Sequence, residues 1–470
     1  MKSIIRHDNW KSFMFIVVCL LVFFIPFNGT SAEGKQDKSD RDWMTNDEYI
    51  QIMNDIVDSS SGRVEFDVAG HSSQGTEIMS ARVGDGDQVL LINSSIHGNE
   101  KSGVEALVEI FDYLGTSDDS YAQSIRDELT IVAVPRLNVD GMEIPQRQNI
   151  FPWDEVVSTY PDLEGAEPAW NYSEKNQGFD INRDFNADLD YEVDPEDLPG
   201  NTLLPGFYIT KEAQLLRDLY VDLQDEFDGV EAFVDLHHMG TPKLNKDGEE
   251  VTMAVDYPPL GNDPDKYADY PELDQEKSKR YALAAGLGAK EFSEDEEKGI
   301  SQYIHFEERD FPGQARSAFA LNGSATVLFE MPGQQPEYGY DQKLVDRVEN
   351  GLWGIVTRMA DGSIDDLNSD DFFEELPRYW TDNISDIRDV LERFTEDNQF
   401  DDTSNARLLD NQLSALETFE SQENKEKMVK HLKGVKVLLK NQKEEDLIDS
   451  EAYNRLDSDI EMLIERWEEK

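Results

Sequence analysis

The sequence predicts an α/β domain, in which helices cover both faces of a central sheet, followed by a small helical bundle. From about Trp43 to about Asp371, short apolar runs typical of buried strands alternate with amphipathic helical runs. Alternation of this kind indicates a sheet that is covered on both faces. After about Phe372 glycine becomes rare and only the helical period remains.

Four apolar runs are predicted to be strands: Gln88–Ile96, Leu129–Pro135, Val230–Leu236 and Ala325–Met331. Apolar residues at helical spacing predict helices over 104–114, Leu215–Leu223 and Leu344–Met359. Two long acidic stretches are interpreted as loops, 186–206 and 243–277.

The C-terminal segment is predicted to form four amphipathic helices. Apolar residues share one helical face within each of four groups, 384–394, 409–419, 428–439 and 453–467. Polar connections between such helices are typical of a small bundle. We therefore predict a helical accessory domain at 372–470, separate from a catalytic domain at 43–371.

The first 32 residues have the pattern of a secretory signal peptide. A basic start precedes an apolar run, Phe13–Phe27, and small residues lead up to Ala32. The run is shorter than the ~20 residues that a membrane-spanning helix needs. We expect cleavage, a secreted protein and no stable membrane insertion afterwards, with a flexible lead-in at 33–42.

The chain is very acidic, with 100 Asp and Glu against 43 Lys and Arg and a net charge of −57. Such a surface repels nucleic acid and anionic membranes. Because salt screens self-repulsion, the acidity favours a salt-loving or alkaline extracellular habitat. A disordered acidic chain is excluded by the 38% hydrophobic and 10% aromatic content.

The only cysteine, Cys19, lies in the predicted signal peptide. The mature protein therefore has no disulfide and no thiolate metal ligand. Any metal must be bound by His, Asp or Glu.

Histidines stand at the ends of two predicted strands. His97-Gly98-Asn99-Glu100 follows one strand, and Asp235-Leu236-His237-His238 ends another. Strand ends are where ligand sites form in open α/β sheets. Each cluster by itself is as consistent with a polar turn or a hydrogen-bonded core histidine, but two His and one Glu together are the ligand set of catalytic zinc.

Two further clusters carry chemistry of a different kind. Glu330 interrupts an apolar strand, where a charge is costly unless it is used or paired. It is either a Glu at a strand edge facing solvent or a general base beside a metal. Arg183, in Asp180-Ile181-Asn182-Arg183, offers a planar fork suited to a carboxylate, although by itself it is an ordinary loop arginine.

These four clusters, taken in order, resemble the metallocarboxypeptidase family (peptidase family M14) across roughly Trp43 to Asp371. Two more segments add to the resemblance, Asn138-Val139-Asp140-Gly141 and Arg147-Gln148-Asn149. It implies a mixed central sheet flanked by helices and one Zn²⁺ per chain. The implied reaction is hydrolysis of C-terminal peptide bonds in substrates with a free carboxylate.

The resemblance assigns His97, Glu100 and His237 as the zinc ligands. His238 is the rival for the third position, but neighbouring strand residues point to opposite faces, so only one of the two histidines is expected to bind. Asp180 would accept a hydrogen bond from the far nitrogen of His97.

The resemblance also implies the catalytic and substrate-binding groups. Glu330 would be the general base that takes a proton from the zinc-bound water and passes it to the leaving amine. Arg147 would stabilise the oxyanion. Asn182 and Arg183 would bind the terminal carboxylate of the substrate.

The sequence departs from the family in two places. Val139 replaces a proline that is frequent in the family's turn. The family's substrate-closing tyrosine is assigned to Tyr303, with His305, Gln314 and Arg316 nearby as groups that could replace it.

Two other functions remain open. The same fold hosts zinc amidases that act on cell-wall peptides and deacylases that act on N-acyl amino acids. A non-catalytic surface-binding protein is the third alternative, because the C-terminal bundle resembles the FIMAH module of some secreted bacterial proteins and could contact a surface or a protein.

Overall fold

The structure is a computed structural model that describes residues 42–240, 245, 249–261, 265–293, 297–303, 310–333, 339–378, 383–396, 399–445 and 447–469. The predicted signal peptide and nearly all of the lead-in lie outside these residues. In the described part, no helix is both long and apolar enough to cross a bilayer.

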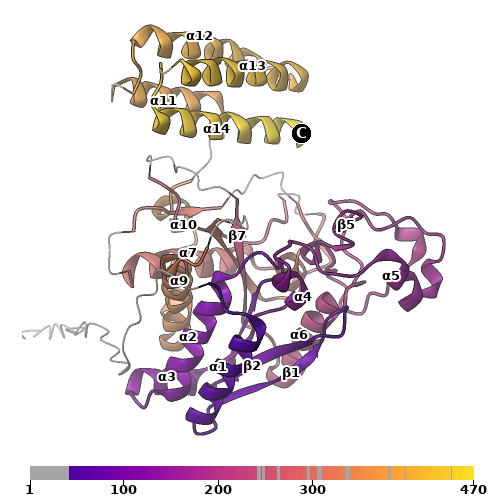
Figure 1. Ribbon diagram of the computed structural model, residues 1–470. Helices are drawn as coiled ribbons and strands as arrows, with labels where there is room; N and C mark the ends of the chain where they lie inside the picture. The colour runs from indigo at the N-terminus through magenta and orange to yellow at the C-terminus, as the bar shows by residue number, and fades with distance from the viewer. Residues whose placement is uncertain are drawn as a thin grey trace, which may run out of the picture. The chain divides into compact units, whose positions relative to one another are not determined.

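An eight-stranded mixed sheet forms the centre of the fold (Figure 1), in the order β1-β2-β4-β3-β7-β10-β8-β9. The strands are β1 (Val64–His71), β2 (Glu77–Val83), β3 (Gln88–Ser94), β4 (Leu129–Val134), β7 (Ala232–Met239), β8 (Met253–Asp256), β9 (Ile300–Gln302) and β10 (Ala325–Pro332). The four central strands, β4, β3, β7 and β10, run parallel. All four were predicted from their apolar runs.

Helices cover both faces of this sheet, as predicted. On one face, α1, α2, α3, α7 and α9 share an apolar core with strand residues such as Ile92 and Val234. On the other face, α6 and α8 pack against the alternate residues, such as Leu91 and Phe233. We call these the α2 face and the α6 face. The helices are α1 (Asn46–Ser59), α2 (Ser102–Thr116), α3 (Ser120–Glu128), α6 (Lys211–Phe227), α7 (Gln275–Glu291), α8 (Ala315–Leu321) and α9 (Gln342–Asp361).

The outer strands were not predicted. β1 and β2 expose many side chains, so they lack a continuous apolar run. β8 lies inside the stretch 243–277 that was interpreted as a loop, and this interpretation was wrong at β8 because the four-residue strand pairs with β10. The other stretch, 186–206, contains only one short 3-10 turn, η4 (Pro195–Asp197).

Several short elements lie between β4 and α6 in the chain. They are α4 (Val139–Glu143), α5 (Trp153–Thr159), η2 (Pro161–Leu163), η3 (Ile181–Arg183) and the two-stranded sheet of β5 (Tyr172–Ser173) and β6 (Gly178–Phe179). After α9 follow η5 (Ser363–Asp366) and α10 (Asp371–Glu375). Phe372 and Leu376 pack in the core of the α2 face.

Four helices follow, as predicted: α11 (Ile384–Glu396), α12 (Thr403–Glu420), α13 (Lys425–Glu444) and α14 (Ser450–Glu469). One apolar core holds them together, and it contains the residues that share a face in the sequence, for example Ile387, Leu413, Leu432 and Leu463. The boundary between this bundle and the sheet domain stays a prediction.

Candidate metal centre and active site

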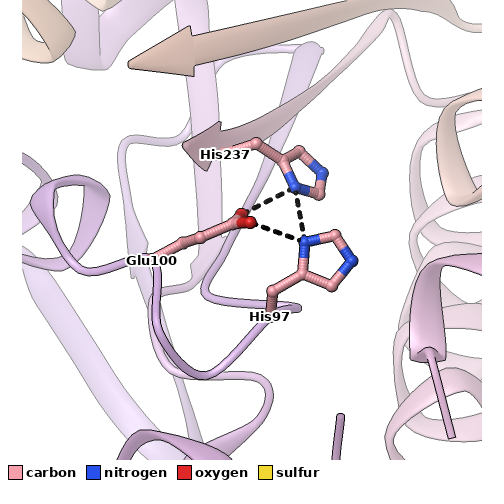
Figure 2. A group of neighbouring side chains, drawn as sticks. All are labelled: His97, Glu100 and His237. Atoms are coloured by element: carbon pink, nitrogen blue, oxygen red, sulfur yellow. Dashed lines mark hydrogen bonds and ion pairs between the residues drawn. The ribbon is translucent and has the colours of Figure 1, made fainter. Parts of the chain in front are cut away.

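Three side chains converge at the carboxyl ends of β3 and β7 (Figure 2). His97 and Glu100 lie on the loop after β3, and His237 lies near the end of β7. Glu100 Oε1 lies 2.9 Å from His97 Nδ1, and Glu100 Oε2 lies 2.9 Å from His237 Nδ1. The two Nδ1 atoms are 3.1 Å apart. All three residues are buried, so this group is shielded from water.

The outer nitrogen of each ring faces a carboxylate. His97 Nε2 lies 3.1 Å from Asp180 Oδ1, as predicted, and His237 Nε2 lies 2.8 Å from Asp235 Oδ2. Each carboxylate therefore favours the tautomer with the proton on Nε2, which leaves the Nδ1 lone pair directed into the cluster.

The resulting set fits a metal ion. Two ring nitrogens and two carboxylate oxygens meet at hydrogen-bonding distances, and such a set of donor atoms can hold a cation. A tetrahedral zinc with ligand bonds of about 2.0–2.1 Å separates its ligand atoms by about 3.3 Å, close to the distances in this cluster. His97, Glu100 and His237 thus form a buried site that could hold a metal ion.

The protonation of the cluster leads to the same conclusion. Burial by itself would lower the pKa of His237, but Asp235 and Glu100 raise that pKa to about 10. Burial would raise the pKa of Glu100, but the charges of His97 and His237 hold it well below its ordinary value. Without a metal, the site therefore attracts a proton, because its environment favours positive charge.

His238 points away from this cluster. Its Nε2 lies 2.7 Å from Ser102 Oγ, at the start of α2, and its Nδ1 lies 3.1 Å from the carbonyl oxygen of Gly333. The alternation of side chains along β7 thus places His237 on the α6 face and His238 on the α2 face.

Two turns bring His97 close to Arg147. A Cβ atom on Gly98 would lie 2.1 Å from the carbonyl carbon of Gly141, so this contact requires glycine. Asn138 Nδ2 donates to the carbonyl oxygens of Ile96 and Arg147, at 3.3 and 3.2 Å. The segments His97–Glu100 and Asn138–Gly141 therefore form one packed unit.

Arg147 lies beside the ligand atoms. Its Nε and Nη2 donate to Asp180 Oδ2 at 3.0 and 2.9 Å. Its Nη1 lies 3.2 Å from His97 Nδ1 and 3.8 Å from Glu100 Oε1. Burial would raise the pKa of Asp180, but Arg147, Arg183 and His97 hold it well below its ordinary value, so this carboxylate is ionised.

Glu330 lies on the strand next to His237. The two residues are direct partners in the parallel pairing of β10 with β7, so their side chains leave the sheet on the same face. Glu330 is only 8% exposed, and its Oε2 has no hydrogen-bond partner among the described residues. Burial raises its pKa to about 7, partly offset by His237, Arg316 and Arg147.

Asn182 and Arg183 lie in η3, next to the cluster. Asn182 Nδ2 lies 3.1 Å from His237 Nε2 and 3.4 Å from Asp235 Oδ2, and its Oδ1 accepts from the Ala315 amide at 3.0 Å. Both ends of this amide are therefore engaged within the protein. The guanidinium of Arg183 lies over the Phe311 ring, 5.6 Å from its centre.

Tyr303 directly follows β9 and is half-buried. It packs against an apolar cluster that includes Met239, Val251 and Ala254. His305 lies outside the described residues. The assignment of a substrate-closing tyrosine stays a prediction.

Sequence reasoning gave no role to Asp235, which orients His237. Its signal was a charged residue two positions before His237 in a buried strand, where alternate residues share a face. Sequence reasoning also missed Glu212, a fully buried carboxylate in α6 that accepts from Ser73 and Asn149.

Comparisons with known proteins agree with this site. The chain matches the family model Peptidase_M14, zinc carboxypeptidase, over residues 49–276, and the FIMAH domain model over residues 384–465. The first range includes every residue of the metal cluster and Arg147, whereas Glu330 and Tyr303 lie beyond it. A search of curated proteins found no match.

Several solved structures are similar at low sequence identity. A metallo-carboxypeptidase from Burkholderia cenocepacia is 14% identical over 68% of this chain and 70% of that chain, with a TM-score of 0.44. Carboxypeptidase A from Helicoverpa armigera is 14% identical over 68% and 73%, with a TM-score of 0.46. Bovine thrombin-activatable fibrinolysis inhibitor, solved with tick carboxypeptidase inhibitor, is 14% identical over 69% and 98%, also with a TM-score of 0.46.

The two family matches correspond to two parts of the chain. The M14 match covers most of the sheet domain, including the His-Glu-His cluster, and the FIMAH match covers the C-terminal helices. The chain therefore carries a domain of the M14 zinc carboxypeptidase family, which identifies it as a metallocarboxypeptidase, and its C-terminal helices are a FIMAH domain.

Proposed function

We propose that this protein is a secreted carboxypeptidase that removes residues from the free C-termini of peptides, with one Zn²⁺ per chain held by His97, Glu100 and His237. Zinc in such a site acts as a Lewis acid toward the substrate carbonyl and makes water a stronger nucleophile. The remaining roles belong to residues of the chain.

The buried carboxylate of Glu330 is the observation that carries the proposal. It lies opposite His237 in the sheet and has an oxygen without a partner among the described residues. A carboxylate in this position can take the proton of the attacking water and pass it to the leaving amine. Its raised pKa of about 7 brings it near the range in which proton transfer in both directions is efficient.

Two arginines would stabilise negative charge on the substrate, one at the oxyanion and the other at the terminal carboxylate. Arg147 Nη1 lies beside the ligand atoms and is fixed there by Asp180, so it is placed to stabilise the oxyanion. Arg183, with Asn182, would bind the terminal carboxylate. Because Asn182 already bonds to Asp235 and Ala315, we assign the larger share of this binding to Arg183.

Export and surface contact complete the proposal. The N-terminal 32 residues would be removed by signal peptidase during secretion. The FIMAH helices would contact a surface or a protein, while the sheet domain acts on peptides.

Pairs of peptides with free and amidated C-termini test the proposal. We expect release of the C-terminal residue from the free peptides, observed by mass spectrometry, and at least a hundredfold slower cleavage of the amidated ones. The reason is that a charge-assisted pair with Arg183 is lost together with the substrate's carboxylate. Equal cleavage of both forms would reject the exopeptidase assignment.

A further inference from the structure

A buried ion pair lies on the α6 face, beyond Glu330 on the side away from the metal cluster. Asp256 ends β8 and is fully buried, and Arg316 in α8 is 2% exposed. Arg316 Nη1 donates to Asp256 Oδ2 at 3.2 Å. The sequence named Arg316 only as a group that could replace the substrate-closing tyrosine, and the proposed function does not use this pair.

The register of the sheet places the pair beside the general base. β10 pairs with β8 such that Glu330 is opposite Ala254 and Leu328 is opposite Asp256. Residues two apart on a strand share a face, so Asp256 and Glu330 leave the sheet on the same side. The charge of Arg316 acts on Glu330 directly, because it is one of the groups that lower the pKa of this carboxyl.

The start of α8 also contacts the segment assigned to carboxylate binding. The Ala315 amide donates to Asn182 Oδ1 at 3.0 Å, and the Phe185 amide donates to the carbonyl oxygen of Gly313 at 3.1 Å. The helix that carries Arg316 thus contacts the Asn182–Arg183 segment, and the charge of Arg316 acts on Glu330. In the proposed binding mode, the carbonyl carbon of the substrate's last residue would face Glu330 and its carboxylate would face Arg183, so its side chain would lie near Arg316.

One edge of the Arg316 guanidinium is left open. Nε donates to Gln314 Oε1 at 3.0 Å, and Nη1 donates to Asp256 and to the Tyr257 carbonyl oxygen. Nη2 has no hydrogen-bond partner among the described residues. It is also not fully enclosed by the atoms around it. Asp256 and Tyr257 thus fix the guanidinium while its Nη2 edge stays accessible.

We propose that Arg316, oriented by Asp256, selects substrates whose C-terminal residue has an acidic side chain. This inference rests on the proposed function and adds the substrate class. An accessible N–H edge of a buried guanidinium is well suited to a carboxylate, because a charge-assisted hydrogen bond gains strength away from water. The selection opposes the net charge of −57, which attracts basic peptides over long distances.

The first test compares kcat/KM for peptides that differ only in the last residue, Glu, Gln or Lys. Glu and Gln have nearly the same shape, so their ratio isolates the charge. We expect Glu to exceed Gln by about tenfold or more and Lys to be the poorest substrate. Equal rates for Glu and Gln, or a preference for Lys, would overturn the proposal.

Variants of the pair sharpen this test. Arg316→Gln should abolish the preference for Glu over Gln, whereas Asp256→Asn should increase it, because the guanidinium then keeps its full charge. Arg347→Gln is the matched control, since Arg347 also pairs with a carboxylate, Glu297, at 3.0 Å, and its ratio should equal that of the wild type. If Arg316→Gln does not fold, Asp256→Asn provides the test. A Glu-over-Gln preference that is unchanged or reversed in Asp256→Asn would count against the proposal.

An equilibrium measurement separates this inference from the proposed function. The zinc-loaded Glu330→Gln protein is titrated with acetyl-Ala-Glu and acetyl-Ala-Gln by calorimetry. About tenfold tighter binding of the Glu ligand supports the inference even if no peptide is cleaved by the wild type. Equal binding overturns it even if the wild type proves to be an active carboxypeptidase.

Discussion

Asp180 bridges Arg147 and His97. Its Oδ2 accepts two hydrogen bonds from Arg147, at 2.9 and 3.0 Å, and its Oδ1 lies 3.1 Å from His97 Nε2. One carboxylate thus orients a metal ligand and also fixes the cation assigned to the oxyanion. A change at Asp180 would therefore affect both the proposed metal site and the proposed oxyanion site.

Asp180→Asn should weaken zinc binding by about 10- to 100-fold, because the tautomer and orientation of His97 lose their support. Competition titration with a zinc chelator measures this change. Asp190→Asn is the matched control, since Asp190 lies on the same stretch of chain but is exposed. Wild-type affinity in Asp180→Asn would show that His97 does not depend on this carboxylate.

Glu330→Gln should retain one equivalent of zinc but lose about 10²- to 10⁴-fold in kcat, as expected for removal of a general base. Metal analysis and steady-state kinetics on the same sample check both parts. Turnover within a few fold of the wild type would exclude Glu330 as the base.

The same carboxyl predicts the pH profile of the wild type. A base must be ionised, so activity falls as pH drops through the pKa of Glu330, which burial raises to about 7. Bound zinc adds positive charge nearby and lowers this pKa, so the acidic limb of kcat/KM should lie at or below pH 7. An acidic limb well above pH 7 would assign the limiting ionisation to another group.

Asn149 connects helix α6 with two loops, one of which contains Arg147 and the other Asp180. Its Nδ2 donates to Glu212 Oε2 at 3.0 Å, and its Oδ1 accepts from the Phe179 amide at 2.8 Å. Asn149→Ala leaves both buried partners with one bond fewer. The free energy of unfolding should fall by about 1–3 kcal/mol, which urea unfolding would measure.

A control for this variant is Asn368→Ala, at an exposed position, which should change stability by no more than about 0.5 kcal/mol. Asn149→Ala should also reduce kcat more than it raises KM, since it displaces Arg147 rather than Arg183. Equal losses in the free energy of unfolding in the two variants would show that Asn149 does not stabilise the contact between these loops and α6.

Salt should stabilise this protein. With a net charge of −57, self-repulsion opposes the compact state, and about 1 M salt shortens the screening length to about 3 Å. The melting temperature should therefore rise between 0.1 and 1 M sodium chloride. A constant or falling melting temperature would contradict a salt-adapted surface.

The centre of the fold could be predicted from the sequence, and its edges could not. The runs that became β3, β4, β7 and β10 are apolar on both faces because helices cover both faces, so each is visible by itself. β8 ends in Asp256, whose charge is compensated by Arg316, sixty residues later in the chain. A buried charge with so distant a partner looks like a loop residue in the sequence.

The metal cluster could be predicted because its members stand directly at strand ends in short motifs. The contacts of Asp180 with Arg147, and of Asp235 with His237, depend on how loops and strands meet in space. Two spatial details were available in advance. The alternation rule assigned His237 and His238 to opposite faces, and the family resemblance gave the contact of Asp180 with His97.

Zinc dependence is the most direct test of the account. The purified protein is assayed on a peptide with a free C-terminus, then with a chelator, and then after stepwise return of zinc. We predict loss of activity with the chelator and full recovery at one equivalent of zinc per chain, with neither activity nor zinc binding in His237→Ala. Activity that persists after complete removal of metal would contradict the account.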